Sequence, residues 1–286
     1  MLIISKFAPF VLFYIMLGVG MSTNIKNFIE VFKNLKVLFI GLASQIIILP
    51  LIGFLFAFFA TSDPMLKVGI VLITCMPSAV TSNYITKLAG GNLALSVSLT
   101  SISACLSFAT IPFMFIIISP MVVSEVTVLH DLDFKKMSLG LLILSTIPVL
   151  IGVFLNTKFF IFVKKINKFF SYSSLLLFLI LIVGAWVSEW DAVSQLYKSI
   201  GFLLLFLLVT ILIIVNILLN LLNLNLENRK AIIIETFIQN SAMAIIVGQL
   251  TLGFGSGYMA VAAIYALLQY KVLFLWWATK KFVTNI

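Results

Sequence analysis

Long apolar stretches separated by short polar connections follow one another along the whole chain. In a membrane only helices and closed barrels satisfy the backbone hydrogen-bonding groups, and barrel strands show strict alternation of apolar and polar residues. The stretches here do not alternate, and about twenty apolar residues let a helix cross the hydrocarbon core. The pattern therefore predicts an all-α polytopic membrane protein with nine transmembrane helices, at residues 7–23, 36–60, 65–87, 92–119, 137–156, 169–188, 199–222, 230–250 and 256–278.

Two of the predicted spans, 65–87 and 230–250, are less uniformly apolar than the others. Each follows an apolar span and precedes a long one, so region 199–278 repeats the order of region 36–119. An odd number of spans separates the starts of the two regions, and the repeats are therefore inverted. Paired interrupted helices in inverted repeats are typical of secondary transporters that bind their substrate near the middle of the membrane.

The composition agrees with a chain surrounded by the lipid bilayer. Hydrophobic residues make up 63% of the 286 residues, charged residues make up 9%, and the mean hydropathy is +1.25. A water-soluble protein of this composition would expose far more apolar surface than such proteins tolerate. The segment 7–22 has the length of a signal-peptide core but lacks a clear small-residue cleavage site, so we interpret it as a retained helix.

The net charge of +9 would suggest a nucleic-acid partner in a soluble protein. Here the basic residues lie in the short connections, with twelve lysine and arginine residues on one side of the predicted membrane and five on the other. The positive-inside rule explains this asymmetry, so we expect no nucleic-acid partner. The rule predicts a multi-pass protein of the cytoplasmic (inner) cell membrane, with its N-terminus outside and its C-terminus inside.

Ionisable side chains within membrane spans are costly and mark functional sites, and two lie deep within the predicted spans, Glu235 and Lys271. Glu235 and Gln239 are four residues apart and share a helix face. If the helix is interrupted there, freed carbonyl oxygens join them and form an oxygen-rich site for a hard cation. The alternative is a protonated Glu235 that is hydrogen-bonded to its neighbours. Gln45, in the middle of the second span, also needs a partner for its amide.

The third span contains Pro77, which removes a hydrogen-bond donor and opens the helix. Ser82 and Asn83 follow it and are candidates for binding a ligand. Ser96 and Thr100 lie four residues apart on one face of the next span, so both hydroxyls point the same way. The alternative is that these hydroxyls bond to backbone carbonyls one turn back, which is common in membrane helices.

Three stretches resemble the bile acid:sodium symporter family. Residues 77–96 read PSAVTSNYITKLAGGNLALS and resemble the family's signature at its first crossing helix. Residues 235–244 read ETFIQNSAMA and resemble the second signature, in which Glu, Gln and Asn recur in this register. Residues 16–50, reading MLGVGMSTNIKNFIEVFKNLKVLFIGLASQIIILP, also resemble the family. The chain is similar to a nine-helix, bacterial-type member over essentially its whole length.

The resemblance implies a fold like that of sodium/proton antiporters. Such a fold has a core domain, in which two unwound helices cross, that moves against a panel domain. The chain would then form a single transmembrane transporter domain, residues 1–286. The panel would comprise 7–23, 137–156 and 169–188, and the core would comprise 36–119 and 199–278.

The resemblance also implies two sodium sites behind the crossing. One would be formed by Ser82, Asn83, Ser96, Thr100 and the Glu235 carboxylate. The other would be formed by Gln45, Glu235, Gln239 and the backbone oxygens of Thr236 and Ile238. Sodium would be the coupling ion, and no cofactor or other metal is expected.

The substrate side departs from the family pattern in two places. Where the family often has Pro-Gly-Gly-Thr-Ala, residues 77–81 read Pro-Ser-Ala-Val-Thr, and where members often carry His-Asn, residues 269–270 read Gln-Tyr. The candidate substrate contacts, with lower support than the sodium ligands, are Val80, Thr81, Asn240, Gln269, Tyr270 and Lys271.

Lys271 has three interpretations. Its long side chain can extend to the membrane surface, it can pair with Glu235, or it can lie in the cleft between core and panel. In the cleft its ammonium would attract a carboxylate or sulfonate at low dielectric. We expect the third arrangement.

The function predicted from these features is a monomeric, sodium-coupled symporter that imports an organic anion by alternating access. Bile-acid-like amphipaths and small carboxylates such as pantoate both fit. The alternative is a cation/proton exchanger on the same fold, in which Glu235 titrates and Lys271 pairs with it. An intramembrane enzyme would need a nucleophile with its base, or paired aspartates. No aspartate lies within a predicted span, and the single histidine, His130, lies in a predicted loop, so we expect no enzyme.

Overall fold

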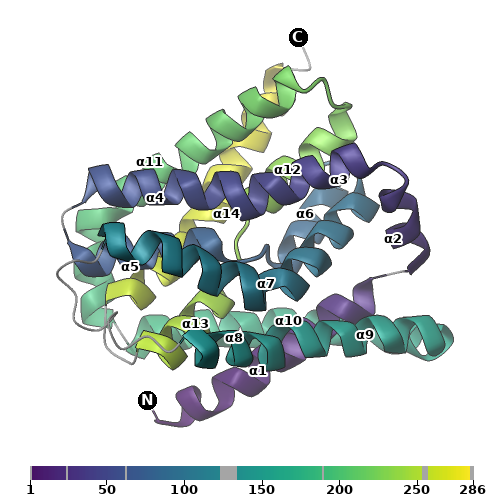
Figure 1. The fold of residues 1–286 in the computed structure, drawn as a ribbon, viewed down its shortest axis with the longest axis horizontal. Coiled ribbons are helices and arrows are strands. Elements are labelled where there is room, and N and C mark those ends of the chain that lie inside the picture. The colour runs from purple at the N-terminus through teal and green to yellow at the C-terminus, as the bar shows by residue number, and fades with distance from the viewer. Residues whose placement is uncertain are drawn as a thin grey trace.

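The computed structural model describes residues 2–23, 25–61, 63–122, 134–188, 190–252 and 257–283, so His130 lies outside the described part. Within these ranges the chain is helical, apart from turns and one isolated antiparallel bridge between Ser78 and Gln239 (Figure 1). The helices are α1 (Leu2–Ser22), α2 (Ile25–Phe32), α3 (Leu35–Ala43), η1 (Ser44–Ile48), α4 (Leu49–Ala60), α5 (Pro64–Cys75), α6 (Val80–Leu88), α7 (Leu93–Val122), α8 (Phe134–Leu141), η3 (Leu142–Thr146), α9 (Ile147–Lys158), α10 (Phe160–Ser188), α11 (Trp190–Leu221), α12 (Leu226–Phe237), α13 (Ser241–Leu252) and α14 (Gly257–Val283).

Six stretches of the described chain are helical, long and apolar enough to cross a membrane. They are Leu35–Phe59, Leu93–Ile117, Phe134–Lys158, Phe160–Gly184, Ile200–Leu221 and Met259–Trp276. Three shorter apolar helices accompany them, at Phe7–Ser22, Pro64–Cys75 and Ser241–Leu250. The prediction of an all-helical polytopic membrane protein is therefore confirmed.

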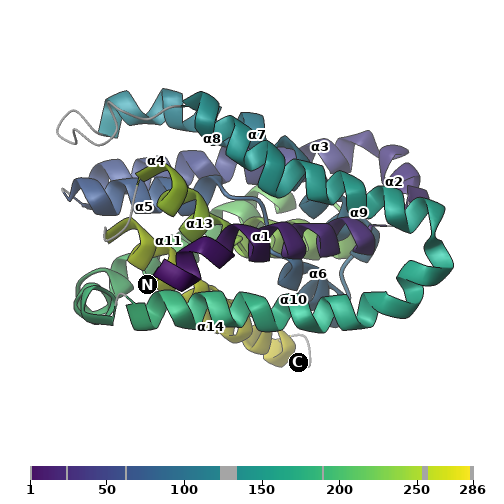
Figure 2. The same cartoon turned by 90° about the horizontal axis from the view of Figure 1, so that it is seen from below.

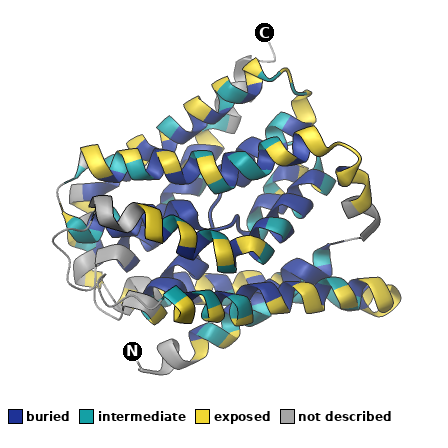
Figure 3. Cartoon of the chain, viewed as in Figure 1, coloured by how far each residue is buried: buried dark blue, intermediate teal, exposed yellow. Residues whose placement is uncertain are grey.

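Many large apolar residues are exposed, and Figure 3 shows exposed positions in yellow along the outer helices. Phe10, Phe59 and Phe202, for example, are each more than seven-tenths exposed, as expected for side chains that face lipid. Glu235 is 1% exposed and is the one charged side chain among the buried residues of the described chain. The most costly buried group therefore lies where the sequence predicts a functional site.

Some helices extend beyond the apolar spans. Helix α10 begins at Phe160, nine residues before the predicted span, and continues through the lysines of residues 164–168. Lysine favours the helical conformation, so the backbone is already helical before the predicted apolar span begins at residue 169. Hydropathy marks the apolar limit of a span and does not mark the end of its helix. The eight-residue amphipathic helix α2 was not predicted for the same reason.

Two long helices each contain a π-helical turn just before a proline. In η1 the N–H of Leu49 donates to the carbonyl of Ser44, five residues back, and Pro50 follows. In η3 the N–H of Ile147 donates to Leu142 in the same way, before Pro148. Proline lacks an N–H and its ring collides with the carbonyl four residues back, so the wider turn relieves the clash. The first of these turns contains Gln45.

Helix α1 packs along α9 and α10 (Figure 2). Its crossing with α9 depends on two glycines, because a Cβ on Gly20 would lie 2.1 Å from the Val149 carbonyl oxygen. A Cβ on Gly152 would lie 2.4 Å from the Leu17 carbonyl oxygen. Small residues let membrane helices approach closely and gain van der Waals contact. The two helices therefore form a tightly packed pair.

One face of α7 is joined to α1 and to the α8–η3–α9 segment by hydroxyl hydrogen bonds. Most of these bonds end on backbone carbonyl oxygens of α7, and the acceptor positions recur at helical spacing. The contacts are Thr23 Oγ1 with Ser101 Oγ (2.6 Å), Ser145 Oγ to Ala104 O (3.0 Å), Thr146 Oγ1 to Cys105 O (2.9 Å) and Ser138 Oγ to Phe108 O. We call this row of contacts the α7 seam.

Candidate functional site

Two helical segments are interrupted in the buried interior of the protein. The two interruptions, which we call breaks, lie against each other. Helix α5 ends at Cys75 and α6 begins at Val80, whereas α12 ends at Phe237 and α13 begins at Ser241. The predicted interruptions of the third and eighth spans are therefore confirmed as breaks. Pro77 contributes to the first break because it cannot donate a backbone hydrogen bond.

Backbone hydrogen bonds join the two breaks. The N–H of Asn240 donates to the Pro77 carbonyl at 2.9 Å, and the N–H of Ala79 donates to the Ile238 carbonyl at 3.3 Å. These bonds flank the bridge between Ser78 and Gln239. Backbone groups freed by the breaks thus satisfy each other, as buried polar groups must. We call this region the crossing.

The Glu235 carboxylate lies beside the crossing and accepts hydrogen bonds from four hydroxyls. Oε1 accepts from Ser82 and from Ser96, each at 2.5 Å. Oε2 accepts from Thr100 at 2.7 Å and from Ser78. These residues come from α12, from the first break with α6, and from α7, so three separate parts of the chain meet at one carboxylate. We call these residues, Ser78, Ser82, Ser96, Thr100 and Glu235, together with Asn83, the hydroxyl cluster.

The hydroxyl cluster contains more close oxygen–oxygen contacts than its hydroxyl protons can form as hydrogen bonds. Ser96 Oγ lies 2.5 Å from Glu235 Oε1, 2.8 Å from Asn83 Oδ1 and 3.2 Å from Thr86 Oγ1. Thr100 Oγ1 lies 2.7 Å from Glu235 Oε2 and 3.0 Å from the Ser96 carbonyl oxygen. A hydroxyl has one proton to donate. The remaining contacts bring lone pairs together, an arrangement that a bound cation relieves.

Several buried polar atoms around the second break have no hydrogen-bond partner. They include both amide atoms of Gln45, Gln239 Oε1, Thr236 Oγ1 and Ser241 Oγ. Gln45 lies on η1, which packs against α12, and shares a small cavity with Met76 and Pro77. Buried polar atoms are normally paired, so unpartnered oxygens here indicate that a ligand belongs with them. We call Gln45, Thr236, Gln239 and Ser241 the amide cluster.

Other backbone and side-chain atoms of this turn are already engaged. Gln239 Nε2 donates to the Thr236 carbonyl at 2.7 Å, and the Ile238 carbonyl accepts from Ala79. Gln269 Oε1 accepts from the Gln239 N–H at 2.9 Å, and Gln269 Nε2 lies 3.4 Å from the Gln239 carbonyl oxygen. Gln269 therefore supports the backbone of the crossing.

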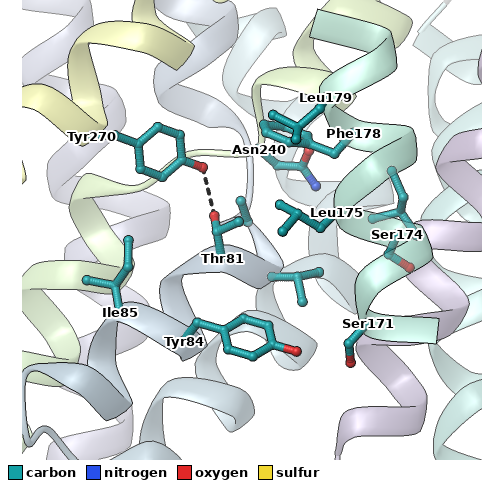
Figure 4. Close-up of a pocket in the computed structure, with 13 residues that line it drawn as sticks. Thr81, Tyr84, Ile85, Ser171, Ser174, Leu175, Phe178, Leu179, Asn240 and Tyr270 are labelled. Carbon is teal, nitrogen blue, oxygen red and sulfur yellow. Dashed lines mark hydrogen bonds between the residues drawn. The ribbon is translucent and has the colours of Figure 1, made fainter. Parts of the chain in front are cut away.

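A pocket of about 280 Å³ opens on the other side of the crossing, between α6, α10, α14 and α1 (Figure 4). Four of the predicted substrate contacts line it: Val80, Thr81, Asn240 and Tyr270. The Tyr270 hydroxyl is hydrogen-bonded to Thr81 Oγ1 at 2.8 Å. Asn240 Oδ1 caps α13 by accepting from the Met243 N–H at 3.0 Å. The prediction thus identified much of one wall of this pocket.

The structure does not bring Gln269 or Lys271 to this pocket. Gln269 is fully buried behind the crossing, and Lys271 is exposed on α14. Successive residues on a helix point about 100° apart, so three neighbours face three different surroundings. Tyr270 alone of the three faces the pocket, and it also lines a second, apolar pocket of about 310 Å³ with Ile85.

Sequence reasoning missed two residues of the site. Ser78 contacts the carboxylate, although the sequence indicated residues 77–81 only as a departure from the family pattern on the substrate side. Ser174 on α10 is 5% exposed, lines the pocket, and its hydroxyl has no hydrogen-bond partner. Its only signal was a polar residue within the apolar span 169–188.

In the described part of the chain, His, Cys, Asp and Glu side chains form no group of three that could hold a metal ion. The oxygen-bearing side chains gathered beside the crossing are instead hydroxyls, amides and a single carboxylate. Neutral oxygens with one negative charge suit a monovalent cation better than a divalent one, because fewer charges need balancing.

Comparison with known proteins agrees with this geometry. The model of the sodium bile acid symporter family matches residues 9–196, which include the first break and the two α7 hydroxyls that contact Glu235 but end before Glu235 itself. The uncharacterized sodium-dependent transporter YocS of Bacillus subtilis is 30% identical over 258 residues, covering 84% of this chain and 73% of YocS.

Two eukaryotic relatives match over shorter shares of their length. The human ileal sodium/bile acid cotransporter is 29% identical over 215 residues, which is 71% of this chain and 61% of that protein. The probable sodium/metabolite cotransporter BASS6 of Arabidopsis thaliana is 30% identical over 151 residues, which is 51% of this chain and 35% of that protein. The chain therefore belongs to the sodium bile acid symporter family, whose members are membrane transporters coupled to sodium.

Proposed function

We propose that this chain is a symporter that couples sodium entry to the import of an organic anion by alternating access. The observation that carries the proposal is the Glu235 carboxylate, buried among four hydroxyls directly beside the crossing. A charge buried in a membrane protein needs a partner, and a sodium ion supplies both the opposite charge and the acceptor for crowded lone pairs.

We place the first sodium ion in the hydroxyl cluster. Its ligands are Ser82, Asn83, Ser96, Thr100 and Glu235. We place a second sodium ion in the amide cluster. Its ligands are the side chains of Gln45 and Gln239 and the backbone oxygens of Thr236 and Ile238. The unpartnered oxygens of Gln45 and Gln239 support this second position.

The substrate pocket offers positive potential without a charged side chain among its lining residues. Helix α6 begins at Val80 with no side-chain cap, so its first N–H groups are free to face a ligand. Asn240 precedes and caps α13 on the same side of the crossing. The N-terminal ends of helices carry partial positive charge and favour anions. A carboxylate or sulfonate would bind between these two ends.

The pocket also explains how ion and substrate are coupled. Thr81 lies next to Ser82, and Asn240 lies next to Gln239, so substrate contacts alternate with ion ligands along both breaks. Sodium on one side of the crossing orders the backbone that binds the substrate on the other. Differential binding to one state of a two-state carrier is what couples the two ligands.

We infer nine spans in two inverted halves, with α5–α6 and α12–α13 each counted as one broken span. Helices α1, α8–α9 and α10 form the panel, and the other spans form the core. The pocket has walls from both parts, with Ile15 on α1 and Phe178 on α10 facing α6 and α14. Movement of the core against the panel would therefore open the pocket to either side of the membrane.

The inward sodium gradient and the membrane potential provide the driving force. Each positive charge that crosses the full potential contributes about 2.3 kcal/mol per 100 mV. The family relatives include bile acid and metabolite cotransporters, so we consider both bile-acid-like and small carboxylate substrates.

Thermal stability of the purified protein across a panel of anions, with and without sodium, tests this function. We expect sodium alone to raise the melting temperature, and the correct anion to raise it further only when sodium is present. Potassium at equal ionic strength is the control. Stabilisation by protons instead of sodium, without response to any anion, would favour a cation/proton exchanger. The second feature of that alternative, a Lys271–Glu235 pair, finds no support because Lys271 is exposed and Glu235 is not.

Replacing Ser174 with alanine should weaken substrate binding several-fold (about 1 kcal/mol), because Ser174 lines the pocket and its buried, unpartnered hydroxyl would turn to a bound anion. Sodium affinity should stay unchanged, since Ser174 contacts none of the residues in the hydroxyl cluster. Lys271→Met is the matched variant outside the pocket and should leave substrate half-saturation at the wild-type value. A raised half-saturation in Lys271→Met alone would restore lysine as the anchor for the anion.

Single cysteines at exposed positions test the orientation. Leu88 is 81% exposed at the end of α6, and Trp190 is 59% exposed at the start of α11. In a background with Cys75 and Cys105 replaced, a membrane-impermeant thiol reagent added outside should label Trp190→Cys and not Leu88→Cys. The reverse pattern would invert the proposed topology.

A further inference from the structure

Ser78 is held in place within the crossing. It is 1% exposed, forms the bridge with Gln239, and lies between the two backbone hydrogen bonds that join the breaks. Its backbone therefore cannot move away without disrupting the crossing. From this position its hydroxyl reaches Glu235 Oε2 and lies 3.1 Å from Thr100 Oγ1.

Ser78 completes the engagement of the Glu235 carboxylate on one side. Oε1 is taken by Ser82 and Ser96, and Oε2 is taken by Thr100 and Ser78. Both carboxylate oxygens are thus engaged by residues of the hydroxyl cluster, whereas the amide cluster retains unpartnered neutral oxygens. To contribute to the amide cluster, Oε2 must give up the hydrogen bond from Ser78.

We propose that Ser78 is a positioning residue that commits the Glu235 carboxylate to the first sodium position and so makes the two sodium ions bind in a fixed order with unequal affinity. This inference rests on the proposed function. The first ion binds where the full negative charge is, and the second binds to neutral oxygens with little electrostatic attraction. Near the half-saturating concentration, sodium dependence then reflects one ion.

A hydroxyl at residue 78 distinguishes this chain from the glycine-containing form of the motif. Without it, Oε2 is free to turn between the two clusters, and one carboxylate is shared by two ions. Sharing lowers the affinity for the first ion and raises the affinity for the second, so the two ions bind over the same range of sodium concentration. The number of ions that respond together is therefore set by one side chain that is not itself needed to complete a ligand shell.

The test measures sodium-dependent thermal stabilisation of the full-length protein without substrate, so that binding is read separately from transport. For the wild type we expect the slope of stability against the logarithm of sodium concentration, near half-saturation, to correspond to about one bound ion. For Ser78→Ala we expect that slope to rise toward about two ions, with half-saturation shifted about threefold to tenfold upward by the lost hydrogen bond. Ser78→Gly, the second variant without a hydroxyl, should match Ser78→Ala.

Two control variants separate positioning from general packing. Ser78→Thr keeps the hydroxyl and should restore the wild-type sodium dependence. Ser107→Ala removes a buried hydroxyl of α7 that bonds only to the Ala104 carbonyl at 2.7 Å, and it should leave the sodium curve unchanged. Reversal potentials in proteoliposomes then give the number of sodium ions that move with each substrate.

A sodium curve for Ser78→Ala with the wild-type slope and midpoint overturns the inference, and so does a Ser107→Ala curve that changes like it. Failure of the proposed function looks different, because then the wild type itself shows no stabilisation by sodium. Sodium stabilisation in the wild type that is absent from Glu235→Ala, together with an unchanged Ser78→Ala curve, rejects the ordering alone.

Discussion

Replacing Glu235 with alanine is expected to abolish both sodium-dependent uptake and sodium-dependent stabilisation, a loss of at least about 100-fold in sodium affinity. The carboxylate supplies the single negative charge of the ion site, and no other charged side chain among the described buried residues can replace it. The protein should still fold. Ser82 and Thr100 already lie within hydrogen-bond distance of the Ala79 and Ser96 carbonyl oxygens, so their hydroxyls keep a partner.

The matched control is Glu30→Ala, which removes an exposed carboxylate on α2 and should leave sodium dependence intact. Asn83→Ala should have an intermediate effect, because it removes one neutral ligand. The measurements are uptake by cells or proteoliposomes and melting temperature against sodium concentration. Wild-type sodium dependence in Glu235→Ala would reject the assignment of the ion site.

Replacing Gly152 with alanine is expected to separate α1 from α9 and to lower the melting temperature sharply. The new Cβ would lie 2.4 Å from the Leu17 carbonyl oxygen and 2.6 Å from the Met21 amide nitrogen. These are backbone atoms of α1, so only a shift of the whole helix relieves the clash. Overpacking of this kind costs about 1–3 kcal/mol or more, a large share of the stability of a protein.

Gly140→Ala provides the control within the same predicted span. A Cβ there would meet nothing within 4 Å, and alanine is about 1 kcal/mol more favourable than glycine in a helix. The same chemical change should therefore be neutral or stabilising at residue 140 and strongly destabilising at residue 152. Equal melting temperatures for the two variants would show that the close crossing of α1 and α9 does not exist in the folded protein.

The spans, the breaks and the buried acid were predictable because lipid makes polar groups conspicuous. A carboxylate, a proline or an amide within an apolar stretch has a high cost, so it indicates a specific need. The breaks at Pro77 and near Gln239 follow from such residues, and the hydroxyls that contact Glu235 were found by matching the sequence to family motifs. The π-helical turn that contains Gln45 was not predicted, because it depends on how Pro50 is relieved locally.

The roles of residues 269–271 were not predictable from the motif, because each residue added to a helix turns the side chain by about 100°. A comparison that identifies the segment does not by itself identify which neighbour faces the pocket. Gln269 supports the crossing, Tyr270 faces the pocket, and Lys271 is exposed. Ser78 was missed for a related reason: its contact with Glu235 depends on how the two breaks lie against each other, which sequence spacing does not describe.

The α7 seam has a consequence for genetics. Three of its four acceptors are backbone carbonyls, at Ala104, Cys105 and Phe108, which no substitution on α7 removes. Their donors are hydroxyls of Ser145, Thr146 and Ser138, each of which a single substitution deletes. A saturation screen will therefore assign the contact to α8 and η3, and it will find α7 tolerant there except to larger side chains. Two surfaces that contribute equally to one interface will differ in their mutational sensitivity.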